Sequence, residues 1–332
     1  MMPPKNVMLI LLASLLLFIT IQRLRSYENF TLLRNCTAEE IKEEVTTAQS
    51  ENKTIEVLIK PVVGINGLAA LPPFKDSVTH MIFADRYKLG ACLLPKVMST
   101  VMTAVLCYLN DDKAFLNASR DIATERFGIR FCEEKIERYS MSKFEDEFNK
   151  DHNYTMFTVV REPIDRFLAA FVDKCYYEPR RSTNHYDCYG CGESIKCFIN
   201  RMHTRFWYYL GGRHTLDVLD HHVMPQTWHC DMQHYLQKYK ILRYVSHTSE
   251  SYNSFLNELN STLTETNVPQ AQRQHVLKAL STSSSYHTTT GKSQRQLYED
   301  RVRGNPHLME KLINIYYYDY VTFGFKIPEI NV

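Results

Sequence analysis

The sequence predicts an α/β protein with a mostly parallel sheet flanked by helices. Short apolar or β-branched runs alternate with longer segments of helical periodicity along most of the chain. Strands that alternate with helices in this way are expected to form a mostly parallel sheet, and two of the runs each end in a cationic residue just before a helix. The chain has 332 residues, of which 44% are hydrophobic, so it can bury one large core or two small ones. Its net charge of +2 favours no class of partner, and we expect no nucleic acid.

Residues 7–24 are predicted to form a membrane anchor. Between residues 7 and 21 only Ser14 and Thr20 are polar, and a helix of this run spans about 22 Å. A cleaved signal peptide is the alternative, but no small-residue cleavage site follows the run. We favour an uncleaved signal anchor preceded by a cytoplasmic tail at residues 1–6. Lys5 before the run and Arg23 and Arg25 after it leave the orientation open by charge counting.

Glycosylation sequons and cysteines indicate on which side of the membrane the rest of the chain lies. All nine cysteines and six N-x-[ST] sequons follow the apolar run, the sequons at Asn29, Asn35, Asn52, Asn117, Asn153 and Asn260. Together they are typical of an oxidising lumen. We therefore expect a single-pass type II protein with a luminal stem at residues 25–54 and a luminal domain at residues 55–332.

The folded part shows strand and helix patterns in a regular order. The predicted strands are residues 78–84, 89–94, 154–160 and 240–245, and the predicted helices are residues 98–109, 250–263, 270–280 and 307–318. Residues 122–148 are predicted to be charged helical segments that bury Phe127, Ile136, Phe144 and Phe148. Residues 175–197 form a loop rich in cysteine and tyrosine.

The stretch P-K-V-M-S-T at residues 95–100 separates a buried strand from a helix. The free N–H groups and the dipole of a helix start favour an anion at such a corner. Lys96 adds a full positive charge, and Ser99 and Thr100 add hydroxyl donors. An ordinary strand-to-helix corner with a serine cap remains the alternative, because the glycines of the Walker pattern are absent.

A second stretch, R-E-P-I-D-R-F-L-A-A-F at residues 161–171, follows the strand at residues 154–160. Pro163 suits the first turn of a helix, and Arg161 stands at the carboxyl end of the strand, where open α/β sheets bind ligands. A nucleotide with phosphate groups at two separate positions would use both this arginine and the turn at Lys96.

These two stretches resemble the 5′-phosphosulfate loop and the 3′-phosphate motif of the Golgi carbohydrate sulfotransferases. The likeness is closest to the branch of the chondroitin 4-O-sulfotransferases and the natural-killer-epitope sulfotransferase, especially its nematode-like members. It extends over residues 87–325 and includes D-K-C at residues 173–175, H-x-x-P-Q-T-W-x-C at residues 222–230 and Y-Y-Y-D-Y-V-T-F-G-F at residues 316–325. The resemblance implies a P-loop-like sulfotransferase fold and 3′-phosphoadenylyl sulfate as the co-substrate, without a metal.

The resemblance also implies roles for individual residues. Lys96 would neutralise the 5′ phosphosulfate, and Arg161 would hold the 3′ phosphate. The phosphosulfate oxygens would lie against the backbone N–H groups of Val97, Met98, Ser99 and Thr100 and against the last two hydroxyls. The family usually has serine where this chain has Ala169, and losing a hydrogen bond to a charged group costs about 1.5–3 kcal/mol. The substitution therefore bears on the affinity for the donor.

The acceptor hydroxyl needs a base within hydrogen-bond reach. His222 is our choice, because it matches a histidine that precedes the cysteine in the related branch. His203 and His152 are the rivals, and a structural role for His222 remains open.

Several cysteines allow more than one interpretation. Cys188, Cys191 and Cys197 suit either disulfides or zinc, and an oxidising lumen favours disulfides, with Cys175 and Cys230 as further partners. Cys92 and Cys107 fall on a buried strand and helix and can be apolar core thiols. Nine is an odd number, so at least one thiol is free or intermolecular.

Residues 194–216 lack acidic side chains and combine cations with aromatic rings, at Lys196, Arg201, Arg205, Arg213, Phe206, Trp207, Tyr208 and Tyr209. The stretch suits an anionic glycan, or it is a helix with core aromatics and solvated cations.

We expect a carbohydrate O-sulfotransferase of the Golgi membrane that acts on a glycosaminoglycan such as chondroitin. One alternative is a type II Golgi glycosyltransferase, which normally carries a D-x-D motif that this chain lacks. Another is a catalytically weak luminal glycan-binding relative, at which Ala169 hints. The oligomeric state stays open.

Overall fold

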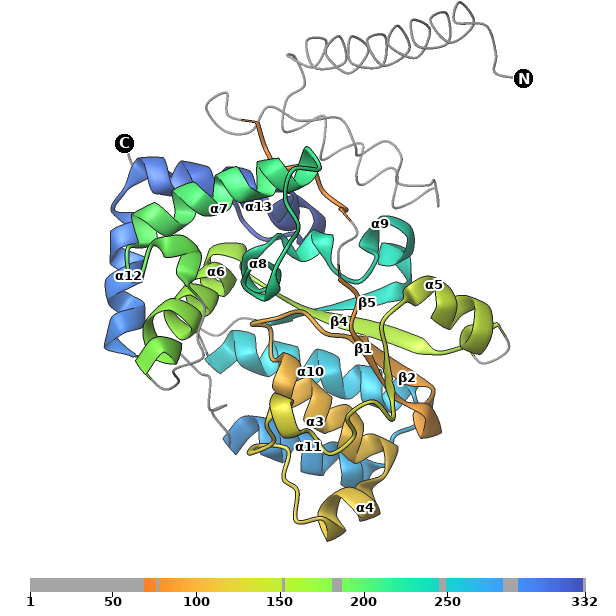
Figure 1. Cartoon of the computed structure of the whole chain (residues 1–332). Helices are drawn as coiled ribbons and strands as arrows, with labels where there is room; N and C mark the ends of the chain where they lie inside the picture. Colours follow the sequence, from red (N-terminus) through yellow and green to blue (C-terminus); the bar gives the residue numbers. More distant parts are fainter. Residues whose placement is uncertain are drawn as a thin grey trace, which may run out of the picture. The chain divides into compact units, whose positions relative to one another are not determined.

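One mixed sheet of five strands, in the order β3-β1-β2-β4-β5, organises the structure (Figure 1). The structure is a computed structural model that describes residues 69–75, 78–150, 153–180, 187–244, 249–282 and 292–330. The strands are β1 (Met81–Ala84), β2 (Leu89–Cys92), β3 (Glu137–Arg138), β4 (Thr155–Arg161) and β5 (Tyr239–Tyr244).

The expected mostly parallel sheet is correct for only half of the pairings. β2, β4 and β5 run parallel, whereas β1 pairs antiparallel with both β2 and β3. Only a short 3-10 turn, Asp85–Tyr87, joins β1 to β2. Such a connection reverses the chain, because a parallel pair needs a crossover of a dozen or more residues.

The sheet belongs to one compact unit that begins at Leu71. The predicted tail, anchor and stem at residues 1–54 lie outside the described residues. In the part of the chain that is described, no helix is both long and apolar enough to cross a membrane.

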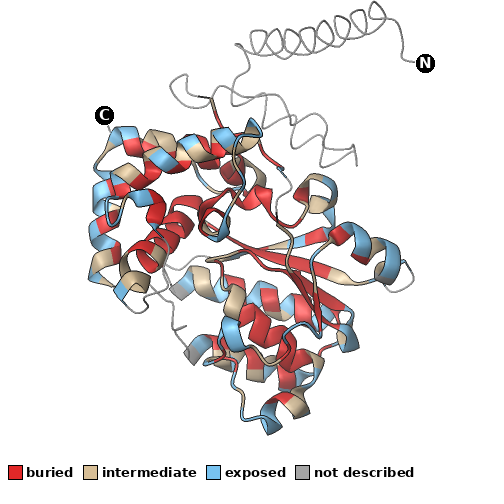
Figure 2. Cartoon of the chain, viewed as in Figure 1, coloured by how far each residue is buried: buried red, intermediate tan, exposed pale blue. Residues whose placement is uncertain are grey.

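Helices cover both faces of the sheet, and Figure 2 shows the strands between them as largely buried. α3 packs on β1, and α10 packs on β5 and α11, whereas α6, α7, α12 and α13 form a second group on the other face (Figure 1). The helix bounds are α3 (Ser99–Asn110), α4 (Asp112–Asn117), α5 (Met141–Phe144), α6 (Pro163–Phe171), α7 (Ile195–Leu210), α8 (Val218–Val223), α9 (Met232–Tyr235), α10 (Ser249–Glu265), α11 (Gln270–Thr282), α12 (Ser293–Arg303) and α13 (Pro306–Phe323).

Local signals account for the best-predicted elements. β4 is rich in β-branched residues and is buried from Met156 onwards. α6 begins at Pro163, and the side chain of Glu162 caps it by accepting from the N–H of Asp165. α13 begins after the cap Asn305 and ends at Gly324, whose φ of 68° suits glycine. Its tyrosines are core residues, as expected.

The prediction of charged helices over residues 122–148 is wrong for most of that span. Turns fill much of it, followed by β3 and α5, and Phe127 is 39% exposed whereas Ile136 and Phe144 are buried as predicted. The side chain of Phe148 lies outside the described residues. Pairing of β3 with β1 takes up backbone groups that a helix would have used.

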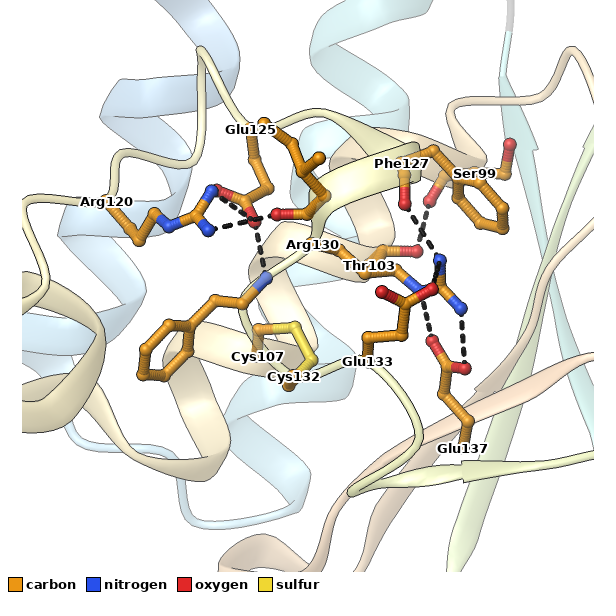
Figure 3. Close-up of a disulfide and its surroundings, with 12 residues drawn as sticks. Ser99, Thr103, Cys107, Arg120, Glu125, Phe127, Arg130, Cys132, Glu133 and Glu137 are labelled. Carbon is orange, nitrogen blue, oxygen red and sulfur yellow. Dashed lines mark hydrogen bonds and ion pairs between the residues drawn. A yellow bond between two sulfur atoms is a disulfide. The ribbon is translucent and has the colours of Figure 1, made fainter.

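A disulfide and three ion pairs, Arg120–Glu125, Arg130–Glu133 and Arg130–Glu137, hold this non-helical segment, as Figure 3 shows. Cys132 is joined to Cys107 of α3, and the guanidinium of Arg130 makes two hydrogen bonds to the carboxylate of Glu137. Burial alone would raise the pKa of Glu137, but the hydrogen bonds from Arg130 and Tyr139 lower it to about 2.

Candidate active site

The two predicted anion motifs lie next to each other at one edge of the sheet. β2 and β4 are adjacent parallel strands, so their carboxyl ends lie side by side. The turn that contains Lys96 follows β2, and Arg161 is the last residue of β4. Nη1 of Arg161 donates to the backbone oxygen of Lys96 at 3.2 Å. The arginine and the turn that one nucleotide is predicted to use are therefore in direct contact.

The turn after β2 has an unusual backbone for residues that are not glycine. Lys96 has a φ of 67° and Met98 a φ of 56°, both in the left-handed region. Such positions cost on the order of 1 kcal/mol or more each and persist only where the surroundings hold them. Two positions of this turn thus have a backbone conformation that glycine adopts most readily, although neither residue is glycine.

The turn leads into the N-terminus of α3, which begins at Ser99. Met98 is its cap residue and supplies no side-chain hydrogen bond, and the first intrahelical bond runs from the N–H of Met102 to Met98. The N–H groups of Ser99, Thr100 and Val101 therefore have no acceptor one turn back within this described helix. Val97 is buried, whereas Ser99 and Thr100 are half-buried. The N–H group of Val97 donates to the backbone oxygen of Leu94 at 3.3 Å, so a donor oxygen would have to compete for it. Met98, Ser99 and Thr100 lie with Lys96 at the turn and the start of α3.

Lys96 is paired with an acid from the helical segment that follows α6. Its Nζ atom lies 2.5 Å from Oδ2 of Asp173, whose side chain is 1% exposed. Nζ of Lys174 lies 3.9 Å from the same oxygen and 2.7 Å from Oε2 of Glu178. Burial lowers the pKa of Lys96, and the charge of Asp173 opposes that shift. The D-K-C stretch thus belongs to the site.

His222 lies on α8 within the electrostatic reach of Lys96. Its Nδ1 atom lies 2.6 Å from the backbone oxygen of Val218, which can only accept, so Nδ1 carries the proton and Nε2 the lone pair. Burial lowers the pKa of His222 well below 6.5, and the charges of Lys96 and Lys174 lower it further. A neutral imidazole within the electrostatic reach of Lys96 can act as a general base.

His203, one of the two rivals, has different neighbours from His222. His203 lies on α7 and accepts a hydrogen bond from Nε1 of Trp207 at 3.1 Å. Burial lowers the pKa of His203, and the next cause is the charge of Lys311 rather than that of Lys96. His152 lies outside the described residues.

The remaining stretches of the family pattern support the end of β4. Gln226 exchanges two hydrogen bonds with the backbone of Arg161, at 2.9 and 2.8 Å. The carboxylate of Asp319 on α13 accepts from the N–H groups of Gln226 and Thr227, at 2.7 and 3.0 Å. Because all these groups are buried, each hydrogen bond also avoids the cost of an unpaired polar atom.

The side chain of Arg161 is buried and makes an ion pair with Asp165 in the first turn of α6. Asp165 also pairs with Arg295 of α12 at 2.5 Å. Ala169 lies further along α6 and is 5% exposed. Its relation to a bound phosphate stays a prediction.

Arg166 belongs to the second motif, but no role was assigned to it from the sequence. It is fully buried, and its guanidinium donates to the backbone oxygens of Pro95 at 2.9 Å and Met224 at 2.7 Å. One side chain thus joins the turn of Lys96 to the end of the helix that carries His222. Its position three residues after Pro163, in the N-terminal part of α6, was the only sequence signal.

All eight cysteines of the described residues form disulfides, namely Cys92–Cys230, Cys107–Cys132, Cys175–Cys188 and Cys191–Cys197. The disulfide interpretation of the Cys188 cluster is confirmed, and the proposal that Cys92 and Cys107 are free core thiols is wrong. Their partners are 138 and 25 residues away, too far for a local pattern to show. The ninth cysteine, Cys36, lies outside the described residues. Nowhere in the described ranges do three potential ligands gather as a metal site would require.

The basic and aromatic stretch forms α7 and the turn after it, and much of it serves the fold. Arg205 pairs with Asp217 and Asp220, and Nη1 of Arg201 donates to the backbone of Tyr189. Phe206 is buried, whereas Tyr208 is 51% exposed. The structural interpretation thus holds for these two arginines and for Phe206.

Comparisons with known proteins agree with this geometry. The model of the sulfotransferase family matches residues 79–326. The chain is 28% identical to the carbohydrate sulfotransferase chst-1 of Caenorhabditis elegans over 80% of this chain and 82% of that protein. It is 32% identical to the putative sulfotransferase vep-2 of the same organism over 67% of this chain and 69% of that protein. No solved structure matches. The family match covers both strand ends, Asp173, His222 and Asp319, and we conclude that the chain belongs to the sulfotransferase family.

Proposed function

We propose that this protein transfers a sulfuryl group from 3′-phosphoadenylyl sulfate to a hydroxyl of a glycan. The observation that carries the proposal is the contact between the two strand ends, where Arg161 reaches the backbone of Lys96. This corner offers cations at two separate points, as a donor with phosphate at both its 3′ and 5′ ends needs. The similarity to a carbohydrate sulfotransferase over most of both chains supports a glycan as the acceptor.

The corner fits the donor by its chemistry. The N–H groups of the first turn of α3 and the charge of Lys96 suit the 5′ phosphosulfate, and Arg161 suits the 3′ phosphate. The co-substrate supplies an activated sulfuryl group whose leaving phosphate gains negative charge as the bond breaks. Lys96 stabilises that charge. Because Lys96 is paired with Asp173, an incoming phosphosulfate competes with this carboxylate for the ammonium group.

The acceptor hydroxyl must lose a proton as its oxygen attacks sulfur. His222 takes this proton on Nε2, since Nδ1 is committed to Val218. Burial, and after it the positive charges of Lys96 and Lys174, lower the pKa of His222 and so keep the imidazole neutral before the reaction. Sulfuryl transfer resembles phosphoryl transfer in relying on positioning and charge neutralisation, and every group named here serves one of these two needs.

We propose a glycosaminoglycan such as chondroitin as the acceptor and the Golgi membrane as the location, with residues 7–24 as a type II anchor. The motifs resemble the chondroitin 4-O branch, and the sequons at Asn117 and Asn153 are exposed. The four described disulfides support an oxidising lumen. The D-x-D motif of many glycosyltransferases is absent from the sequence, which disfavours that alternative.

The test uses the full chain with sulfate-labelled donor and a panel of unsulfated chondroitin, dermatan and heparosan. We expect labelled chondroitin from the wild-type protein and none from the Lys96→Met variant. Retention on an immobilised 3′,5′-bisphosphate nucleotide, with no retention on a nucleotide sugar, separates a sulfotransferase from a glycosyltransferase. Donor binding without transfer to any glycan would favour the non-catalytic relative.

A further inference from the structure

A buried carboxylate lies between two buried guanidinium groups at the proposed 3′-phosphate site. Asp165 offers one carboxylate oxygen to Nε of Arg161 and the other to Nη2 of Arg295, the latter at 2.5 Å. Nη1 of Arg295 also donates to the backbone oxygen of Asp165 at 3.0 Å. All three residues are at most 6% exposed. Arg295 comes from α12, which packs against α6 (Figure 1).

The charges of this cluster have a simple consequence. Arg161 and Asp165 alone would form a neutral pair, and a neutral pair attracts a phosphate dianion weakly. Arg295 adds a second positive charge and returns the three residues to a net charge of +1. Glu299 lies 3.7 Å from Nε of Arg295, but its carboxylate is also bound at 2.7 Å by Arg303, so this second carboxylate has its own cation.

We infer that Arg295 is a positioning residue for the donor, which acts by neutralising Asp165 and so leaves the charge of Arg161 available to the 3′ phosphate. Asp165 in turn orients the guanidinium of Arg161 through its Nε atom. In the buried setting of these groups charge interactions are screened far less than in water, so an uncompensated Asp165 would act strongly on its neighbour. The inference rests on the proposed function, because it concerns the same donor.

Two models of Arg295 make different predictions. If Arg295 acts through Asp165, its loss matters only while Asp165 carries a charge. If instead Arg295 binds the nucleotide itself, its loss costs the same affinity whether residue 165 is charged or neutral. A double-mutant cycle separates the two models.

The experiment measures dissociation constants of the full chain for adenosine 3′,5′-bisphosphate and adenosine 5′-phosphate. Arg295→Gln should weaken binding of the bisphosphate at least tenfold and binding of the monophosphate less than twofold. In the Asp165→Asn background the same substitution should change the binding of the bisphosphate less than threefold. Arg301→Gln, at an exposed position of the same helix, is the matched control and should bind both nucleotides like the wild type.

Equal losses in the two backgrounds would overturn the inference. A second test does not depend on Asp165→Asn being folded: Arg295→Lys keeps the positive charge and should recover most of the affinity, and failure to do so in a protein with the wild-type melting temperature would also overturn it. These outcomes differ from failure of the proposed function, in which the wild-type protein itself would not prefer the bisphosphate.

Discussion

The ammonium group of Lys96 lies 2.5 Å from the carboxylate of Asp173, which stands 77 residues further along the chain. The side chain of Asp173 is 1% exposed, so its charge depends on this partner and on Lys174, whose Nζ lies 3.9 Å from the same oxygen. Lys96 therefore has two roles, one in the proposed transfer and one in a buried ion pair, and substitutions can separate them.

Replacing Lys96 by methionine should abolish transfer while the domain remains folded. The free energy of unfolding should fall by about 1–3 kcal/mol, because Asp173 then loses its closest cation. The double variant Lys96→Met/Asp173→Asn removes the unpaired charge and should recover that stability without recovering activity. Urea unfolding and the transfer assay measure the two effects. Wild-type-like transfer by Lys96→Met would reject the phosphosulfate corner.

The rate should start to decline only at an acidic pH. Because the pKa of His222 is well below 6.5, the proposed base stays deprotonated at pH 6.5, and kcat/KM should decline only on further acidification. His222→Asn should lower the rate about 10²- to 10⁴-fold and leave donor binding intact. His203→Asn is the matched control. The assignment of the base fails if this control loses transfer and His222→Asn does not.

Stability should decrease on acidification through a different histidine. His229 is 1% exposed, and its pKa is held well below 6.5 by burial and then by the charge of Arg166. Below about pH 6.5 the unfolded chain binds a proton that the folded chain excludes, so the free energy of unfolding falls by up to about 1.4 kcal/mol per pH unit.

Urea unfolding at pH 7.5, 6.5 and 5.5 checks this dependence. His229→Asn should have a smaller slope of stability against pH than the wild type, and His307→Asn, at an exposed position, serves as the control. The same slope in His229→Asn and in the wild type would show that other groups cause the pH dependence.

The disulfides should differ in what they contribute. In the chain-entropy model the Cys92–Cys230 bond, which closes a loop of 138 residues, contributes about 5 kcal/mol, and the Cys191–Cys197 bond, with a separation of six, about 2 kcal/mol. Removing the first pair by double substitution with alanine should therefore lower the free energy of unfolding by roughly 3 kcal/mol more. Equal losses in denaturant unfolding would contradict this ranking.

Ala169→Ser should tighten donor binding by up to about ten- to a hundredfold, because the added hydroxyl would donate one charge-assisted hydrogen bond to the 3′ phosphate. A water that already bridges this gap would reduce the gain. Ala170→Ser is the matched control: Ala170 is 0% exposed, so its hydroxyl should cost stability and leave the donor dissociation constant unchanged. Unchanged or weaker donor binding in Ala169→Ser would mean that Ala169 does not face the 3′ phosphate.

The elements that were predicted well carry their signals locally. The buried runs at β2 and β4, the proline that starts α6 and the asparagine that caps α13 are each readable within a few residues. The prediction for residues 122–148 was wrong over residues 122–140 for the opposite reason. Their path depends on the disulfide between Cys107 and Cys132 and on the pairing of β3 with β1, and neither partner is near in sequence.

The candidate site likewise combines features that the local sequence predicts with features that depend on distant residues. Lys96 and Arg161 follow strands and could be found as separate motifs, whereas their contact needed the parallel pairing of β2 with β4. The role of Asp319 could not be predicted from its neighbours in the sequence, because its two carboxylate oxygens accept hydrogen bonds from residues more than 90 positions away. α12 was not predicted because its sequence is largely polar, and for that reason Arg295 was not considered as a site residue.

The Cys92–Cys230 bond also shortens the covalent path between Lys96 and His222. Lys96 stands four residues after Cys92, and His222 eight residues before Cys230. Through the disulfide, the donor corner and the proposed base are thus joined by a tether of about a dozen residues instead of well over a hundred. By the logarithmic law for loop closure, the shorter tether raises the effective concentration of one group near the other by roughly thirtyfold, or about 2 kcal/mol. A molecule whose packing has opened locally would therefore bring His222 back to Lys96 from a much smaller search volume, provided that this one bond stays oxidised.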